Sequence, residues 1–423
     1  MCVIVGIEAM RVLISAFAFS PYRGSECAVG WNIVNELAKL HDVTVLCGDV
    51  RGDMRTKNEL ARYTLQASNR KFMIEYVAPT RFIALLERLH NIPGLWGLYY
   101  CAYGLWQRKA YKRAKELHFE KPFDVVHQLN MIGYREPGYL WKLPVPFVWG
   151  PVGGAPNEPM AFHKMFSWSG CVKVALRTLL NEIQKRMCFR AKRAARKARK
   201  IWAVTDADYQ MIHNLWGVEC DRMVEAGRDD AIAGEVRSYD ATEPLRIVWS
   251  GIHTSRKALP ILLYALHKIG FRKKIRVDIL GEGPETAKWK TLADRLGVSQ
   301  QLTWHGRLPR HGALKVMAQA HVLACPSIKE ASSIVVIEAL SLGLPVICHD
   351  ACGMGIVVTD KCGFKVPLKN PKTSIAGFAN ALKEILVNTG VVAEKSAAAL
   401  ARSNELTWEA KALTFSTAYE GKI

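Results

Sequence analysis

The sequence predicts an α/β protein with two Rossmann-like domains, each built on a doubly wound parallel sheet. Short apolar runs alternate with amphipathic stretches along the chain, which is the pattern of repeated βαβ units. These runs are too numerous for one doubly wound sheet of ordinary size. The chain has 423 residues, and half of them are apolar. It can therefore bury two separate cores.

Each expected strand is a short apolar run bounded by turn residues. The expected strands are residues 12–16, 43–47, 125–127, 147–150, 201–205, 247–250, 277–280, 302–305, 322–326 and 346–348. Apolar residues at helical spacing predict helices at residues 29–40, 261–268, 285–296, 314–319 and 375–386. A final helix is expected to begin after Thr407-Trp408.

A change in composition predicts the domain boundary. Between residues 225 and 243, acidic, glycine and serine residues replace the apolar periodicity, as they do in connecting segments. We therefore expect a first domain at residues 1–224 and a second at residues 225–405. The last helix, at residues 406–423, would then be separate from both.

The cysteines and the apolar segments indicate a cytoplasmic protein. Eleven cysteines, an odd number, are scattered without a Cys-x-x-Cys pair, which indicates reduced thiols. Cys348, Cys352 and Cys362 beside His349 do not have the spacing of a tetrahedral zinc site, so no metal is expected. Residues 1–7 follow no basic segment, so a signal peptide is not expected. The uncharged run at residues 89–107 is too polar for a membrane span.

The net charge of +20 is unevenly distributed along the chain. Residues 186–200 contain eight basic side chains and no acidic one. Just upstream, apolar residues recur at helical spacing, so residues 172–200 predict a basic amphipathic helix of the kind that lies on anionic membranes. A packed helix with a solvated basic face explains the pattern equally well. The apolar residues are Val172, Leu176, Leu179, Leu180, Ile183 and Met187.

A second group of residues favours the membrane interpretation. Aromatic residues between positions 96 and 111 stand next to basic residues between positions 108 and 113, a combination typical of a headgroup region. A nucleic-acid surface uses the same residue types. No DNA- or RNA-binding motif is present in the sequence, so we expect no nucleic-acid partner. The aromatic residues are Trp96, Tyr99, Tyr100, Tyr103, Trp106 and Tyr111, and the basic ones are Arg108, Lys109, Lys112 and Arg113.

The segment from Glu330 to Glu338, Glu-Ala-Ser-Ser-Ile-Val-Val-Ile-Glu, carries most of the functional information. An apolar run ending in Pro326-Ser327 precedes it, and a helix ending at Gly343 and Pro345 follows. A strand, a turn and a helix start direct free N–H groups at an anion. Two carboxylates beside such a site can hold hydroxyl groups, which suits a sugar phosphate. Two glutamates flanking an apolar helix can also be ordinary solvated residues.

This segment resembles the donor-site signature of the retaining GT-B glycosyltransferases of family GT4. The likeness continues through His305-Gly-Arg-Leu-Pro309, Leu280-Gly-Glu-Gly-Pro284 and Trp249-Ser-Gly251 with Arg256-Lys257. Arg11-Val-Leu-Ile-Ser15 and Gly24-Ser-Glu26 are similar to the family's first strand and glycine loop. The resemblance implies a GT-B fold, in which two Rossmann-like domains face each other across a cleft and the C-terminal helix crosses back to the first.

The resemblance also implies the roles of residues in the second domain. Lys257, with Arg256 beside it, would neutralise the donor diphosphate. Glu330 would contact hydroxyls of the transferred sugar, and Glu338 would contact the ribose. The remaining donor-binding residues implied are the phosphate-cradling Ser332, Ser333 and Ile334, the close-approach glycines Gly281 and Gly283, and Arg307 and Leu308 beside the nucleobase.

In the first domain the resemblance points to Gly24 beside the donor and to His127 near the reacting sugar. Glu26 could equally be an ordinary acid in a first helical turn, and a strand-end histidine is often structural. The sequence departs from the family pattern at two positions. Ile252 stands where a second basic residue is usual, and Leu129 stands where a second histidine is usual.

Together these observations predict a hexosyltransferase with a nucleoside-diphosphate-sugar donor, UDP being preferred over GDP. The expected acceptor is a lipid-linked saccharide or polysaccharide precursor at the inner face of the cell membrane. In such enzymes the leaving phosphate can take the acceptor proton, so a carboxylate nucleophile is not obligatory. We expect neither a metal nor a cofactor. A catalytically weakened binding or scaffold subunit and a nucleotide-sugar epimerase of the same fold are the alternatives.

Overall fold

The computed structural model describes residues 8–49, 55–66, 72–90, 92, 95, 97–165, 168–270 and 274–421. Residues 1–7 and Trp96 lie outside these ranges. The chain consists of two compact units. Unit 1 comprises residues 1–155, 183–225 and 408–423, and unit 2 comprises residues 156–182 and 226–407.

The change of unit at Glu225 falls at the start of the expected connecting segment. The segment 156–182 is different, because it lies with unit 2 although the sequence placed it in the first domain. Phe162 explains this position, since its side chain is fully buried in the core of unit 2.

Unit 1 is built on a seven-stranded parallel sheet with the order β3-β2-β1-β4-β5-β6-β7. Helices cover both faces. One core contains side chains of α3, α4 and α6, and the other contains side chains of α1, α2 and α15. The strands are β1 (Arg11–Ala16), β2 (Asp42–Cys47), β3 (Met73–Tyr76), β4 (Val125–Asn130), β5 (Phe147–Val152), β6 (Ala198–Ala203) and β7 (Asp221–Arg222).

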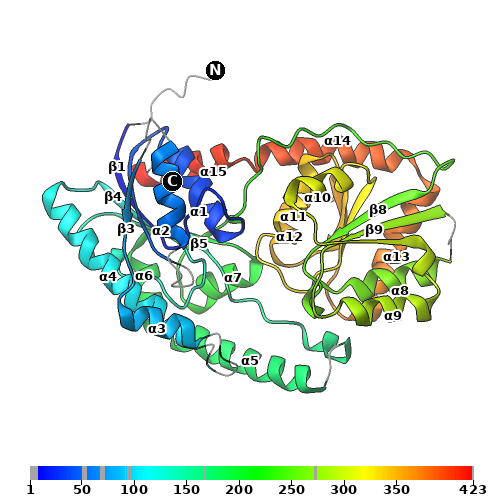
Figure 1. The fold of residues 1–423 in the computed structure, drawn as a ribbon, viewed down its shortest axis with the longest axis horizontal. Helices are drawn as coiled ribbons and strands as arrows, with labels where there is room; N and C mark the ends of the chain where they lie inside the picture. The colour runs from blue at the N-terminus through cyan, green and yellow to red at the C-terminus, as the bar shows by residue number, and fades with distance from the viewer. Residues whose placement is uncertain are drawn as a thin grey trace. The chain divides into compact units, whose positions relative to one another are not determined.

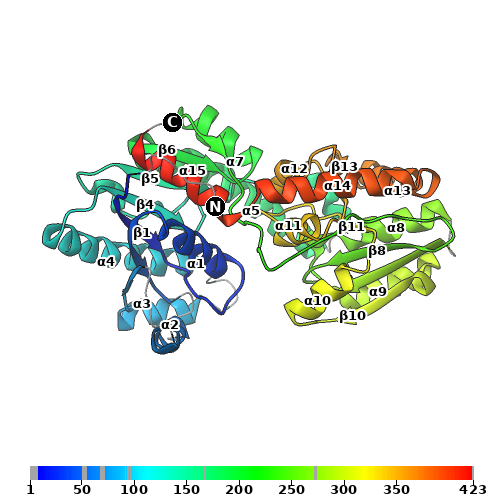
Figure 2. The same cartoon turned by 90° about the horizontal axis from the view of Figure 1, so that it is seen from above.

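The α-helices of unit 1 include the C-terminal one, which packs beside α1 (Figures 1 and 2). The last helix thus returns to the first Rossmann-like unit, as the family resemblance implied. The helices are α1 (Glu26–Leu37), α2 (Arg55–Gln66), α3 (Arg81–Leu89), α4 (Leu98–Glu120), α6 (Phe189–Lys197), α7 (Asp206–Gln210) and α15 (Trp408–Glu420). Short helical turns are η1 (Leu140–Lys142) and η3 (Met211–Leu215).

Unit 2 is built on a six-stranded parallel sheet with the order β10-β9-β8-β11-β12-β13. Figure 1 shows α8, α9 and α13 on one face of this sheet and α11 and α14 on the other. The strands are β8 (Leu245–Ser250), β9 (Ile275–Leu280), β10 (Leu302–Gly306), β11 (Val322–Cys325), β12 (Val346–His349) and β13 (Gly363–Val366). The fold class predicted from the sequence is therefore confirmed: each unit is a doubly wound parallel α/β structure.

Most helices of unit 2 connect consecutive strands of its sheet, and α14 follows α13 after the last strand. They are α8 (Leu259–Ile269), α9 (Thr286–Leu296), α10 (Arg310–Met317), α11 (Ile334–Ser341), α12 (Cys352–Val357), α13 (Pro371–Val387) and α14 (Gly390–Glu405). Short turns are η2 (Met160–Met165), η4 (Ser255–Lys257) and η6 (Ser299–Gln301).

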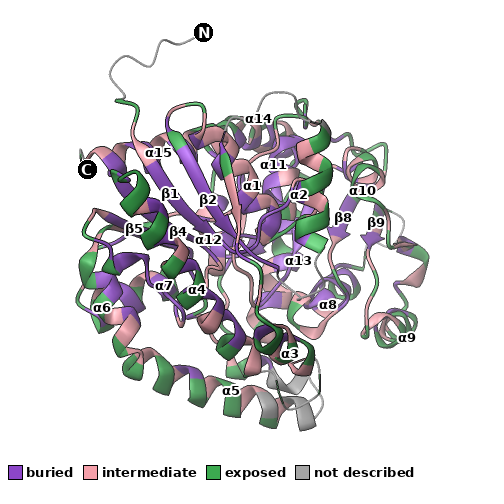
Figure 3. Cartoon of the chain, turned by 60° about the vertical axis from the view of Figure 1, so that its left-hand side comes forward, coloured by how far each residue is buried: buried purple, intermediate pink, exposed green. Residues whose placement is uncertain are grey.

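The predicted single basic helix at residues 172–200 is wrong in its extent. It consists of α5 (Trp168–Met187), which starts in unit 2 and ends in unit 1, then α6, and then the start of β6. Alanines of α6 are buried in the unit 1 core, and Ala198 pairs with β5. Because of these contacts, α6 and β6 are separate elements, and the helical spacing expected over residues 172–200 does not continue through them. Figure 3 shows intermediate and exposed residues along most of α5.

Among the described residues, no helix combines the length and the apolar content needed to cross a bilayer.

Candidate functional site

The strand order of unit 2 reverses between β8 and β11, which lie side by side at the centre of the sheet. Ligands of open α/β sheets bind beyond the carboxyl ends of the strands at such a switch point. Two candidate residues meet there. Lys257 follows β8, Glu330 follows β11, and the Lys257 Nζ atom lies 2.6 Å from the Glu330 Oε1 atom. The two side chains are only 14% and 10% exposed, so this ion pair is mostly shielded from solvent.

Glu338 lies on α11 and is held by an arginine that the sequence analysis did not identify. Arg310 donates from Nε to Glu338 Oε1 at 2.8 Å and from Nη1 to Asp229 Oδ2 at 2.7 Å. Burial raises the pKa of Glu338, and the nearby guanidinium of Arg310 opposes that rise. One carboxylate oxygen of Glu338 is thus occupied by Arg310, while the other can accept a hydrogen bond from a hydroxyl group.

One signal in the sequence could have identified Arg310. It is the first residue of α10, where a cation opposes the helix dipole. A basic residue at that position indicates a nearby carboxylate. Its partner Asp229 is far away in the sequence, in the segment between the two sheets, and periodicity gives no information about such a contact.

In the turn between Glu330 and α11, backbone N–H groups can contact an anion, whereas the serine hydroxyls cannot. The Ser332 and Ser333 side chains are buried. Ser332 Oγ accepts from the Ala226 N–H at 3.4 Å. Ser333 adopts a left-handed conformation with φ of 51° and precedes Ile334, the first residue of the helix. The first N–H groups of a helix have no partner within it, so this turn can bind an anion through its main chain.

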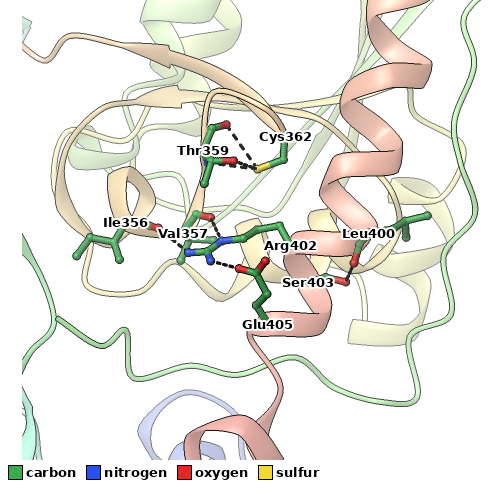
Figure 4. Close-up of polar contacts among 8 residues, drawn as sticks. All are labelled: Ile356, Val357, Thr359, Cys362, Leu400, Arg402, Ser403 and Glu405. Carbon is green, nitrogen blue, oxygen red and sulfur yellow. Dashed lines mark hydrogen bonds and ion pairs between the residues drawn. The ribbon is translucent and has the colours of Figure 1, made fainter. Parts of the chain in front are cut away.

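Neighbouring elements hold this turn in position. Adding a Cβ to Gly353 of α12 would bring it within 1.9 Å of the Ala331 carbonyl oxygen, so α12 packs directly on the turn. Arg402 of α14 in turn binds the end of α12 by donating to the carbonyls of Ile356 and Val357, both at 3.0 Å (Figure 4). These contacts connect the helix layer to the candidate anion site.

The end of β12 supports the Pro-Ser turn that precedes Glu330. His349 is buried and shares hydrogen bonds with the Ser327 carbonyl at 3.0 Å and with Ser374 Oγ at 2.8 Å. Burial lowers the pKa of His349 to about 4, so the imidazole is neutral at physiological pH. His349 is therefore a structural residue.

The glycine loops after β8, β9 and β10 pack tightly against one another. Gly281 has φ of 108°, and a Cβ there would lie 2.0 Å from the Gly251 carbonyl oxygen. A Cβ on Gly283 would lie 2.6 Å from the His253 carbonyl oxygen. The N–H of Gly281 also donates to the Gly306 carbonyl at 2.8 Å. These two glycines are thus required for the packing of the loops that surround the switch point.

The other donor-site candidates of unit 2 lie at its surface. Arg256 and Arg307 are exposed, and Leu308 is half-buried. Arg256 precedes Lys257 in η4, and its carbonyl accepts from the Ile328 N–H at 2.9 Å. This bond ties the loop after β8 to the loop after β11.

In unit 1 the strand order reverses between β1 and β4, and Glu26 lies at that point. The Asn130 side chain at the end of β4 bonds to both main-chain groups of Ala18 and donates to the Glu26 carbonyl at 3.2 Å. Burial raises the pKa of Glu26 to about 7, and a hydrogen bond from the Ile132 backbone opposes the rise. Gly24 is exposed, and its Cα faces open space.

His127 is placed inside the fold of unit 1. Its side chain is 0% exposed. Nε2 lies 2.8 Å from the Gly150 carbonyl, and Nδ1 lies 2.7 Å from the Tyr419 hydroxyl of α15. Because a carbonyl only accepts, Nε2 carries the proton and Nδ1 accepts from Tyr419. Burial lowers the pKa of His127 to about 4. Both nitrogens are used within the fold, so we do not include His127 among the residues that act on the sugar.

Several residues of the expected aromatic and basic group are not available at the protein surface. Tyr103 and Trp106 are buried, and Trp106 donates to the Val77 carbonyl at 2.8 Å. Arg113 pairs with Glu75 at 3.1 Å. By contrast, six apolar residues of α5 predicted to share a face are exposed, and they are Val172, Leu176, Leu179, Leu180, Ile183 and Met187.

Comparison with solved structures shows that the two units together have the GT-B glycosyltransferase fold. The lipopolysaccharide outer core galactosyltransferase WaaB has a TM-score of 0.65 at 15% identity, over 98% of this chain and 100% of the other. An Anabaena protein crystallised with UDP-glucose has a TM-score of 0.58 at 13% identity, over 98% and 100% of the two chains.

A family model matches most of unit 2. Residues 238–399 match the family model "Glycosyl transferases group 1". The matched region contains Lys257, Glu330 and Glu338. The chain is also 29% identical over 215 residues to a D-inositol 3-phosphate glycosyltransferase of Streptomyces scabiei, which is 48% of this chain and 47% of that protein. It thus spans about half the length of the curated relatives it matches.

Proposed function

We propose that this protein transfers a hexose, with retention of configuration, from a nucleoside-diphosphate sugar to a lipid-linked saccharide or polysaccharide precursor at the cytoplasmic membrane surface. UDP is the preferred nucleotide over GDP. The observation that carries the proposal is the Lys257–Glu330 ion pair at the switch point of a group 1 glycosyltransferase region.

Lys257 and Glu330 would divide the recognition of the donor between phosphate and sugar. An ammonium has three N–H donors, so Lys257 can bind Glu330 and a phosphate oxygen together. The contact with Lys257 also holds the Glu330 carboxylate where it can accept from sugar hydroxyls. Main-chain N–H groups around Ser332–Ile334 would bind the second phosphate.

The nucleoside would be bound by residues around α11 and the loop after β10. Glu338, positioned by Arg310, would accept hydrogen bonds from the ribose hydroxyls. Arg307 and Leu308 would lie beside the base, and Gly281 and Gly283 would shape the loops that approach the donor. The preference for UDP draws support from the similar fold of the Anabaena protein that binds UDP-glucose.

The proposed reaction breaks the bond between the anomeric carbon and the diphosphate oxygen. The acceptor hydroxyl oxygen forms the new bond on the same face of the sugar, and its proton passes to the departing phosphate. Negative charge grows on the diphosphate as it leaves. Lys257 and the main-chain N–H groups stabilise that charge. Hydrogen-bond donors that are already in position before the reaction are effective in catalysis.

The exposed apolar face of α5 supports an acceptor at a membrane. A helix with an apolar stripe and neighbouring cations lies in the interface of a bilayer. Its apolar residues are followed by the basic residues of α6. The similar fold of a lipopolysaccharide galactosyltransferase fits an acceptor that carries a lipid.

A second candidate function is a binding or scaffold subunit with weakened catalysis. Ile252, which replaces a basic residue of the family pattern, is 63% exposed and has no charge to offer a phosphate. Leu129 is buried and cannot replace the second histidine. Retained Lys257, Glu330 and Glu338 favour the enzyme over this alternative.

Radiolabel transfer tests the proposal. The full chain is incubated with membrane extract and a panel of labelled UDP- and GDP-hexoses, and lipid-extractable label is measured. We expect transfer from a UDP-hexose, its loss in Glu330→Ala, and normal transfer in Lys383→Ala, whose side chain is exposed on α13. Donor binding without transfer or hydrolysis would favour the scaffold. The absence of donor binding, transfer and hydrolysis would contradict the enzyme proposal.

A further inference from the structure

We propose that a pocket in unit 1 between η1 and α6 binds the phosphate of an anionic phospholipid headgroup. The pocket has a volume of about 550 Å³ and is lined by Trp141, Lys142, Phe189, Arg190, Arg193 and Lys197. This inference rests on the membrane part of the proposed function. It adds a specific headgroup site to a surface that would otherwise bind the membrane only through general attraction between basic residues and anionic lipids.

Three cations converge on the ring of Trp141 in this pocket. The Lys142 and Lys197 Nζ atoms lie 5.4 and 5.5 Å from the ring centroid, and Arg193 Cζ lies 6.0 Å from it. No acidic residue lines the pocket. Within the described part of the chain, Lys142, Arg193 and Lys197 form no ion pair with a carboxylate. Like charges that surround one ring repel each other, and a bound anion would relieve the repulsion.

Trp141 forms a buried base for the pocket, and Arg190 in its lining is already paired with a carboxylate. Trp141 is mostly buried, and its indole N–H donates to the Gly138 carbonyl at 3.1 Å. Arg190 bonds to the Glu136 carboxylate and to the Tyr139 hydroxyl. Arg190 is therefore committed to the protein, whereas Lys142, Arg193 and Lys197 remain to donate to a phosphate.

The remaining wall favours a lipid over a soluble anion. Phe189 lines the pocket and is 73% exposed. The exposed Met187 and Ile183 precede it along the chain. Aromatic rings next to cations suit the headgroup depth of a membrane. The phosphate would bind at the cations while Phe189 contacts the glycerol and the first acyl carbons.

Sedimentation with vesicles tests this inference on the full chain. The vesicles contain phosphatidylcholine alone or with phosphatidylglycerol, and the variant carries Lys142→Glu, Arg193→Glu and Lys197→Glu. All three side chains are exposed, so the fold should be retained, and circular dichroism checks this. The control carries Lys369→Glu, Lys372→Glu and Lys383→Glu, which change the net charge equally on exposed positions of unit 2.

We expect the pocket variant to bind phosphatidylglycerol vesicles at least about tenfold more weakly than the control variant, since each cation near an anionic surface contributes to binding. Equal binding of the two variants would overturn the pocket while leaving the membrane proposal intact. Failure of the unmodified protein to bind any vesicle would overturn both. Competition by millimolar inorganic phosphate, or equally tight binding of a short RNA, would overturn the choice of a lipid.

Discussion

The Lys257 ammonium and the Glu330 carboxylate form an ion pair of 2.6 Å across the two central strands of unit 2. The two residues come from loops after β8 and β11, which the strand order makes neighbours. A mostly buried ion pair is costly to form and contributes little net stability. Its position at a switch point indicates that binding explains it better than folding does.

Replacing Lys257 with Met should lower kcat/KM for sugar transfer by about 10² to 10³-fold, because a charge that stabilises the leaving diphosphate is lost. Glu330→Gln should also lower kcat/KM. Because the two residues act together, the double variant should lose less than the product of the two single effects. Initial rates with a labelled UDP-hexose measure this. A Lys257→Met rate equal to that of Lys383→Met would contradict the assigned role.

Arg310→Gln should weaken UDP binding in a pH-dependent way. Arg310 opposes the rise in the pKa of Glu338 that burial causes. Without Arg310 that pKa rises further, so at a given pH a smaller fraction of molecules has an ionised Glu338. Calorimetry should show UDP affinity recovering as the pH is raised from 6 to 8. Glu338→Gln, which cannot ionise, should bind weakly at both pH values, and a similar pH dependence in this variant would argue against the explanation.

Glu26→Gln should remove a pH dependence from the stability of the protein. Burial raises the pKa of Glu26 from 4.5 to about 7, so its contribution to stability is present below pH 4.5 and is lost as the pH rises through about 7. The variant should match the wild type at pH 5 and exceed its Tm at pH 8. A difference of about 1 kcal/mol corresponds to about 2–4 °C in Tm. Parallel Tm profiles from pH 5 to 8 would show that Glu26 ionises normally.

Tyr419→Phe should destabilise unit 1 by about 1–3 kcal/mol, because the buried Nδ1 of His127 loses its donor. Urea unfolding followed by tryptophan fluorescence measures the change. Transfer activity per folded molecule should be unaffected, since His127 is assigned a structural role. A large fall in kcat with unchanged stability would instead assign His127 to the reaction.

Replacing the exposed apolar residues Leu176, Leu179 and Ile183 with Gln should weaken binding to anionic vesicles by at least about tenfold, because each apolar side chain gains free energy on burial. The fold should be unaffected. A matched control replaces Leu65, Val236 and Val387, which are exposed apolar residues away from α5. Equal loss in the two triple variants would show that α5 has no special part in membrane binding.

The central strands of both sheets were predictable from the sequence, and several edge strands were not. β3, β7 and β13 lie at sheet edges and were missed. β3 and β7 have no buried residue, and β13 has only two. Edge strands face a neighbour on one side only, so their sequences need fewer apolar residues, and the alternation that identifies a strand is weak.

The candidate site was predictable in its residues and not in its contacts. Glu330 was found in a local strand–turn–helix pattern, and Lys257 was found through the family resemblance. The bonds from Arg310 to Glu338 and Asp229 join distant segments. His127 illustrates the same limit, since a hydroxyl 292 residues away decides its role. Periodicity contains no information about such partners.

A crystal structure with bound UDP-hexose tests the central claim most directly, because that claim locates the diphosphate at the junction of β11 and α11. We predict a phosphate oxygen within hydrogen-bond distance of Lys257 Nζ and of a main-chain N–H near Ile334, with Glu330 at the sugar and Glu338 at the ribose. A nucleotide bound elsewhere in the protein, with the Lys257–Glu330 pair untouched by phosphate or sugar, would contradict the account.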